Sequence, residues 1–154
     1  MSEPSDYPRI PMPALLRHAR STYGRTMRTA LERAGFDDVP ANGLYIIGGL
    51  ALGAEGVPIR QLVRELGVTK QAAGQLVDTL VMRGYLVRTP DEVDRRQLIV
   101  TLTERGRAAA ETQTAARARI DALLAERVGE ADVAAARRAL VALIAIGDEE
   151  REAA

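Results

Sequence analysis

The side chains best suited to chemistry in this sequence are the cationic and amide groups near its middle. Lys70 can contact a phosphate, and Gln71 or Gln75 can form two hydrogen bonds with the N6 and N7 edge of adenine. Further along the chain, the adjacent Arg95 and Arg96 can enter a DNA minor groove, where the negative potential attracts arginine. These residue types indicate recognition of double-stranded DNA.

Two predicted helices must position the first of these groups. Apolar residues at helical spacing predict a short helix over residues 59–66, which Gly67 ends. Thr69 then suits an N-cap, because its hydroxyl can accept a hydrogen bond from a free backbone N–H, and a second helix runs to about Met82 before Gly84. Two helices joined by so short a turn form a helix-turn-helix, whose second helix can enter the major groove.

The second helix has an inward and an outward face. The inward stripe follows helical spacing and comprises Ala72, Ala73, Leu76, Val77 and Leu80. The outward side is formed by Lys70, Gln71, Gly74, Gln75 and Asp78. Gly74 is unusual, because glycine inside a helix costs ~1 kcal/mol relative to alanine. Close approach of the helix backbone to DNA would explain it, and so would a close contact with another helix.

A β-hairpin is predicted directly after the second helix. Residues 85–89 form its first strand and residues 97–102 its second, on which Leu98, Val100 and Leu102 alternate inward. The polar loop 90–96 joins the strands, and a hairpin with such a charged tip after a helix-turn-helix is typical of a wing. We predict a structural role for Asp94, which can orient one of the two loop arginines by a charge-assisted hydrogen bond.

Four short motifs in this stretch resemble the multiple-antibiotic-resistance regulator (MarR) family. They are Leu66-Gly67-Val68-Thr69, Leu76-Val77-Asp78-x-Leu80-x-x-x-Gly84-Tyr85-Leu86, Asp94-Arg95-Arg96, and Leu102-Thr103-x-x-Gly106. The last two together are the most specific. The resemblance implies a dimeric winged-helix regulator, usually a repressor that a small-molecule effector releases. Many members carry a hydroxyl residue and an arginine where this chain has Gly74 and Gln75, which leaves room for different base contacts.

Two helices are predicted before the helix-turn-helix. The first runs from about Pro13, since proline suits the first helical turn, to about Ala34. Asp38 is a candidate N-cap for the second, which runs from Pro40 to about Leu52. Its inward residues are Leu44, Ile47, Leu50 and Ala51. The pair Gly48-Gly49 lowers its helix propensity by up to ~2 kcal/mol, which suggests close packing or a bend.

Two further helices are predicted after the hairpin. Thr103 suits an N-cap for a long helix over residues 104–128, which Gly129 ends, and a last helix begins near Glu130. Their apolar stripes exceed what one small core can cover. The stripes comprise Ile120, Leu123, Leu124 and Val128 on the first helix, and Val133, Ala136, Leu140, Leu143, Ile144 and Gly147 on the second.

These stripes predict a homodimer. We expect residues of about 1–35 and 108–154 to join two copies, and residues of about 40–106 to form the DNA-binding lobe of a single domain spanning 1–154. A two-fold dimer presents its recognition helices one DNA turn, ~34 Å, apart. The predicted operator is therefore pseudo-palindromic.

Composition favours one mainly α-helical domain with a small β-hairpin. The chain has 154 residues, 47% of them apolar and only 3% aromatic, which argues against disorder and against an all-β fold. It has no cysteine and a single histidine, His18, so neither a cysteine-based zinc site nor a thiol sensor is possible. Without a phosphate-binding glycine loop or a nucleophile elbow, neither a cofactor nor an enzymatic activity is expected.

The same composition predicts a cytoplasmic protein. No apolar run approaches the ~18 residues of a membrane span. The N-terminus lacks the apolar core of a signal peptide.

Charge is distributed unevenly although the formal net charge is zero. Residues 57–107 contain nine basic and six acidic side chains, whereas residues 108–154 contain six basic and nine acidic ones. The excess of positive charge therefore lies where phosphates would be contacted. The zero net charge and the pair Gly74-Gln75 keep a second hypothesis open, a winged helix that contacts proteins and has no DNA operator. A third is a small-molecule enzyme or carrier.

Overall fold

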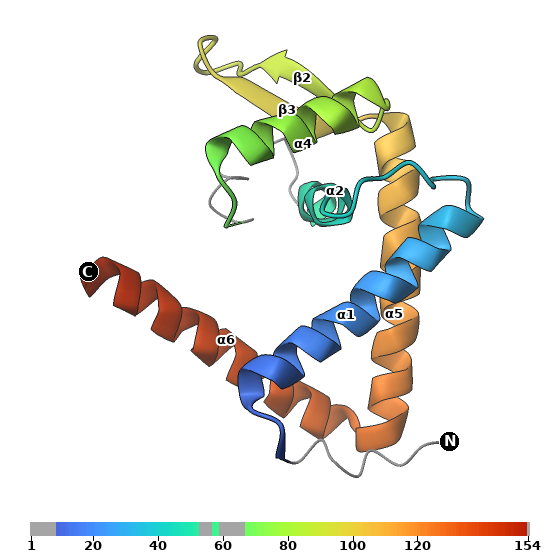
Figure 1. Ribbon diagram of the computed structural model, residues 1–154, viewed down its shortest axis with the longest axis vertical. Helices are drawn as coiled ribbons and strands as arrows, with labels where there is room; N and C mark the ends of the chain where they lie inside the picture. Colours follow the sequence, from blue (N-terminus) through green and yellow to red (C-terminus); the bar gives the residue numbers. More distant parts are fainter. Residues whose placement is uncertain (1–8, 53–56, 59–66, 154) are drawn as a thin grey trace. The chain divides into compact units, whose positions relative to one another are not determined.

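The computed structural model describes residues 9–52, 57–58 and 67–153 (Figure 1). In these ranges the chain is mainly helical and carries one small antiparallel sheet, as the composition predicts. The chain divides into two compact units, one extending to Arg117 and the other beginning at Ala118. None of the helices in the described ranges is long and apolar enough to cross a membrane.

Helix α1 (Met12–Arg33) confirms the first predicted helix to within one residue at each end. It begins after Pro11 and ends before Gly35, whose φ of +84° lies in the left-handed region that favours glycine. The backbone N–H of Phe36 then donates to the carbonyl of Leu31, which closes the helix end.

Helix α2 (Gly43–Leu52) begins three residues later than predicted, and Asp38 is not its cap. The residues before it are held in a turn, because the Arg28 guanidinium donates to the carbonyl of Val39 at 3.2 Å and to that of Ala41 at 3.0 Å. This long-range contact could not be read from local spacing. It overrides the helix start that Pro40 suggested.

The buried face of α2 also differs in part from the prediction. Leu44, Ile47 and Leu50 are buried as expected, but Ala51 is exposed and Ile46 is buried. The buried face of α2 is therefore wider than the narrow apolar stripe that the sequence predicted. Gly48 lies close to a later helix, α5 (Glu104–Val128), since a Cβ placed there would lie 3.2 Å from Oε1 of the buried Gln113.

Helix α4 (Lys70–Met82) confirms the second helix of the predicted helix-turn-helix. Thr69 is its N-cap, with Oγ1 accepting from the Ala72 N–H at 3.1 Å, and Gly84 follows its end with a φ of +77°. The predicted first helix, residues 59–66, lies outside the described residues. The inward stripe of α4 is confirmed at Ala73, Leu76, Val77 and Leu80, whereas Ala72 is exposed because it lies at the edge of that stripe.

The sheet has the order β1-β3-β2, with β1 at Val57–Pro58, β2 at Leu86–Pro90 and β3 at Leu98–Leu102. Both hairpin strands begin one residue later than predicted. Val100 is fully buried and Leu102 half-buried, but Leu98 is 46% exposed, so its inward assignment was wrong. Leu98 pairs with Pro90 at the outer end of the hairpin, away from the core.

Helix α5 (Glu104–Val128) begins against the start of the hairpin. Thr103 caps it as predicted, with Oγ1 accepting from the Gly106 N–H at 3.0 Å. A Cβ at Gly106 would lie 2.1 Å from the carbonyl oxygen of Tyr85, so only glycine allows this approach. The glycine of the Leu-Thr-x-x-Gly motif therefore has a packing role.

The second unit contains the remainder of α5 and helix α6 (Glu130–Ala153), with Gly129 between them at a φ of +87°. Both predicted helices are thus confirmed. Large apolar side chains in this unit stay exposed in the single chain, with exposed fractions from 39% to 66%: Leu123, Leu124, Val128, Leu140, Val141, Leu143, Ile144 and Ile146.

Candidate nucleic-acid interface

The outward face of α4 carries polar groups that are open to solvent. Lys70, Gln71, Gln75 and Asp78 are exposed, as predicted, and Gly74 is half-buried. A Cβ at Gly74 would meet no atom within 4 Å, and its φ is not in the left-handed region. Within the described part of the chain, no packing contact requires glycine at this position.

The loop of the hairpin, residues 91–97, is closed by its own backbone and carboxylates. The Asp91 N–H donates to the carbonyl of Gln97 at 2.8 Å, and the Gln97 N–H donates to that of Asp94 at 2.8 Å. Oδ1 of Asp91 accepts from the Val93 N–H at 2.8 Å, and Oδ1 of Asp94 accepts from the Arg96 N–H at 3.1 Å. The loop therefore has a defined shape.

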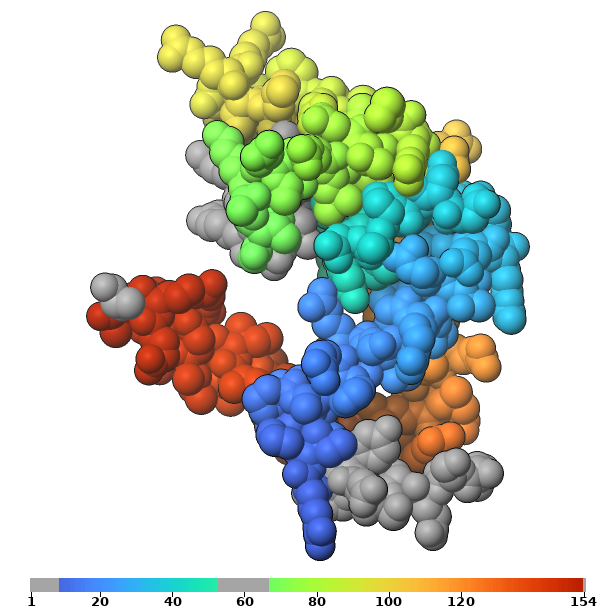
Figure 2. All heavy atoms as spheres, in the orientation of Figure 1, coloured from blue at the N-terminus to red at the C-terminus, as the bar shows by residue number. Residues whose placement is uncertain are grey.

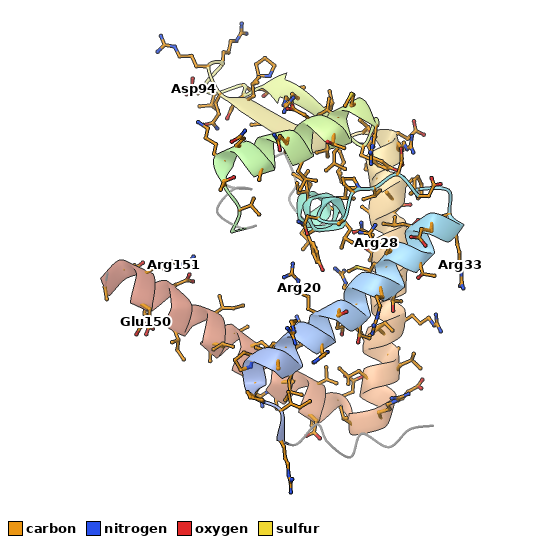
Figure 3. The ribbon with its side chains drawn as sticks, in the orientation of Figure 1. Arg20, Arg28, Arg33, Asp94, Glu150 and Arg151 are labelled. Carbon is orange, nitrogen blue, oxygen red and sulfur yellow. The ribbon has the colours of Figure 1, made fainter. Side chains whose placement is uncertain are left out.

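These bonds correct the expectation for Asp94. Its role in the loop is structural, but it binds a backbone amide, and in this part of the chain it forms no ion pair with an arginine side chain. Asp94 lies at the outer end of the hairpin (Figure 3). Side chains of this segment, drawn in yellow, project outward at the top of the space-filling view (Figure 2).

Arg95 and Arg96 are both exposed, and neither takes part in an ion pair among the described side chains. The two guanidinium groups are therefore available to a phosphate or a groove. The Asp91 and Asp94 carboxylates beside them accept backbone N–H groups of the same loop and form no ion pair with either arginine among the described side chains.

An ion pair that the sequence did not predict joins helix and hairpin. Nη2 of Arg88, on β2, lies 2.5 Å from Oδ1 of Asp78, on α4. The Arg88 side chain is 29% exposed and that of Asp78 is 61% exposed, so the pair contributes more to orientation than to stability. It also neutralises the one carboxylate on the outward face of α4 that was considered for DNA contact.

A second group of charged residues lies at the start of α5 and was also missed. The Tyr85 hydroxyl donates to Oδ1 of Asp38, and Nη2 of Arg105 donates to the same oxygen at 2.9 Å and to the Tyr85 hydroxyl at 3.0 Å. The Arg105 guanidinium carbon lies 4.5 Å from the centre of the Tyr85 ring. Arg83 completes the group by donating to the carbonyl of Asp38.

This environment shifts the pKa values of all three groups. The hydrogen bond from Tyr85 and the charges of Arg105 and Arg83 lower the pKa of Asp38 below its ordinary 3.8. Burial, followed by the bond to Asp38, raises the pKa of Tyr85 from 10.0 to about 12. The bond to Tyr85 raises the pKa of Arg105. The hydroxyl, carboxylate and guanidinium are thus held in one protonation state at neutral pH.

Sequence spacing gave no signal for this group, because Asp38 and Tyr85 are 47 residues apart. Tyr85 stood in a recognised motif, but only as the start of a strand. Among the residues that the structure describes, no group of three or more acidic, histidine or cysteine side chains could hold a metal ion.

Known proteins share both sequence features and the fold of this chain. Residues 39–97 match the model of the MarR family. No curated protein matches the sequence. Solved structures share the fold over most of the chain at low sequence identity, among them FabT, MepR and MarR.

FabT from Streptococcus pneumoniae, solved in complex with DNA, is 22% identical, with a TM-score of 0.75 over 94% of this chain and 99% of that one. The MepR–DNA complex of S. aureus is 18% identical, with a TM-score of 0.71 over 88% and 98%. Wild-type MarR from E. coli in its apo form is 22% identical, with a TM-score of 0.65 over 87% and 97%. At these identities the likeness establishes the fold, which confirms the predicted winged helix.

Proposed function

We propose, from the match of residues 39–97 to the model of the MarR family, that this chain is a transcription regulator that binds double-stranded DNA. The observation that supports this most directly is the pairing of two exposed elements in one unit. Helix α4 presents amide and ammonium groups, and the hairpin loop presents two arginines without ion pairs in the described chain. The Asp78–Arg88 ion pair ties these elements together.

In the proposed complex, α4 lies in the major groove. Thr69 and Lys70, at its N-terminus, contact phosphates, and Gln71 and Gln75 contact base edges. Gly74 lies between the two glutamines on the same face and permits close approach of the helix backbone.

The wing makes the second contact. Arg95 and Arg96 enter the adjacent minor groove, and Asp94 holds the loop that carries them. This contact depends on groove shape and on charge, so it should be sensitive to salt.

We further propose that the protein acts as a homodimer. The exposed apolar side chains of α5 and α6 in the second unit support this, since such a patch on a single chain is typical of an interaction surface. A two-fold dimer would present two α4 helices one DNA turn, ~34 Å, apart and bind a pseudo-palindromic operator.

Repression, release by a small-molecule effector and action in the cytoplasm complete the proposal. A bound dimer would block access of polymerase to a promoter. The buried Gln113 supports a polar ligand or water near α2, because its Nε2 has no hydrogen-bond partner within the described structure. Titration of candidate metabolites into the protein–DNA complex would test release directly.

Arg96→Ala tests the DNA-binding assignment. The protein's own upstream region serves as the operator probe, and affinity is measured over a series of salt concentrations. We expect the substitution to weaken binding by ~1–3 kcal/mol and to flatten the salt dependence. Arg33→Ala is the matched control, because Arg33 is also exposed but lies at the end of α1.

Unchanged affinity and salt slope for Arg96→Ala would show that the wing does not bind DNA. If the wild-type protein shifts no upstream DNA at moderate salt and instead retains a stable protein partner, the protein-interaction hypothesis is favoured.

A further inference from the structure

The Asp38–Tyr85–Arg105 cluster lies where three segments of the first unit meet. Asp38 belongs to the turn between α1 and α2, Tyr85 lies between α4 and β2, and Arg105 is in the first turn of α5. None of these side chains is on the outward face of α4 or in the hairpin loop. The cluster is therefore separate from the groups proposed to contact DNA.

Tyr85 connects α4 and the hairpin, the two elements proposed to contact DNA, to the Asp38–Tyr85–Arg105 cluster. Its N–H donates to the carbonyl of Leu80 at 2.9 Å, which fixes it to the end of α4, and β2 begins at the next residue. Its side chain is fully buried. A displacement of Tyr85 would therefore move the end of α4 and the start of the wing together.

The backbone of Tyr85 is also fixed to α5. The Thr103 N–H donates to its carbonyl at 3.0 Å, and Oγ1 of Thr103 donates to the carbonyl of Gly84 at 2.5 Å. The absence of a side chain at Gly106 allows this contact. The Tyr85 hydroxyl adds two side-chain bonds at the same junction, donating to Asp38 and accepting from Arg105.

The Asp38 end of the cluster is equally constrained. Arg83 donates to the carbonyl of Asp38, and Phe36, two residues earlier, meets the Tyr85 ring edge-on with centroids 6.2 Å apart. Arg105 reaches the carboxylate from the α5 side. The polar bonds thus form a triangle with one corner on each of the three segments.

We propose that Asp38, Tyr85 and Arg105 are positioning residues, which fix the orientation of α4 and the wing relative to the first turns of α5. They would thereby determine DNA affinity without touching DNA. The link to affinity rests on the proposed function, whereas the link to orientation does not.

The orientation can be measured without DNA. Because the chain has no cysteine, spin labels can be attached to single cysteines introduced at exposed sites, Glu92→Cys in the wing and Glu111→Cys on α5. Labelled protein in excess unlabelled protein reports distances within one chain. We expect a narrow distance distribution for the wild type and a broader or shifted one for Tyr85→Phe, which keeps the ring but loses the hydroxyl.

A stability-matched control separates positioning from simple loss of stability. Ile46→Val removes one methyl group from the core next to α2 and is expected to lower the midpoint of urea unfolding. It should leave the distance distribution and the operator Kd unchanged. Asp38→Asn is a second test variant, in case Tyr85→Phe does not fold.

Operator Kd is then measured for the same proteins under conditions where all are folded. We expect the Kd of Tyr85→Phe or Asp38→Asn to rise about tenfold, because a rotated lobe cannot place α4 and the wing in both grooves. An unchanged distance distribution in both variants would overturn the proposal, and so would an altered distribution with an unchanged Kd. Failure of the wild-type protein to bind DNA would instead refute the proposed function, and the distance measurement would still decide the orientation.

Discussion

Gly74→Ala should change stability and DNA binding in opposite directions. Gly74 is inside α4, its φ is not in the left-handed region, and a Cβ there would meet no atom within 4 Å. Nothing in the described structure therefore opposes the substitution. The full helix-propensity difference should appear, and the free energy of unfolding should rise by ~0.5–1 kcal/mol.

DNA binding should weaken, because the space that is open to a Cβ at Gly74 is the space that the DNA would occupy. Gly74 is on the face that carries Gln71 and Gln75, so a methyl group there would hold the helix backbone away from the bases. Lengthening either glutamine contact loses a share of the ~1–3 kcal/mol that a good bidentate pair contributes, so we expect the operator Kd to rise about tenfold.

The assay combines urea denaturation with operator titration on the same preparations. Gly49→Ala is the matched control, since Gly49 also lies inside a helix and its Cβ would also meet nothing within 4 Å, but it lies in α2. It should gain similar stability and keep the wild-type Kd. A stabilised Gly74→Ala with unchanged Kd would refute backbone approach to DNA. Loss of stability would show instead that Gly74 packs against another helix.

Three further outcomes follow from the described contacts. Gly106→Ala should lower the free energy of unfolding by about 3 kcal/mol or more, measured by urea denaturation, because its Cβ would overlap the Tyr85 carbonyl; a smaller loss would mean that α5 can shift. Thr69→Ala should cost ~1 kcal/mol of unfolding free energy through loss of the cap on Ala72, and Thr69→Ser should restore most of it. Folding raises the pKa of Tyr85 from 10.0 to about 12. Its contribution to the free energy of unfolding is therefore complete below pH 10.0 and is lost as the pH rises through 12. Tyr85→Phe should lack this alkaline loss, and equal losses in both proteins would contradict the assignment.

Local patterns were enough to predict five helices and the hairpin among the described residues, but neither β1 nor the start of α2. Thr69 and Thr103 precede their helices with a side chain that can accept a hydrogen bond, and both are caps. Gly84 and Gly129 end helices because the chain there adopts a φ that other residues avoid. Each of these features depends on residues within a few positions, so spacing alone reveals it.

Contacts between distant segments were not predictable in the same way. Asp38 was expected to cap α2, since it precedes a helix, but its carboxylate binds Tyr85 and Arg105. Likewise Arg28 holds the turn before α2 from a position in α1. Such pairings depend on the tertiary arrangement, and a single sequence gives no measure of it. The DNA-contacting side chains remain a prediction, because their assignment depends on a partner.

The positions of the charged side chains bear on the objection that a neutral chain should bind DNA poorly. The formal net charge is zero, but affinity depends on the charges that face the duplex. Asp78 is paired with Arg88, while Asp91 and Asp94 bind backbone amides of their own loop. Arg95 and Arg96 form no ion pair in the described chain, so two cations without an ion-pair partner are exposed at the wing although the net charge of the chain is zero. The position of exposed, unpaired arginines, rather than the net charge of the chain, would then determine the attraction to phosphates.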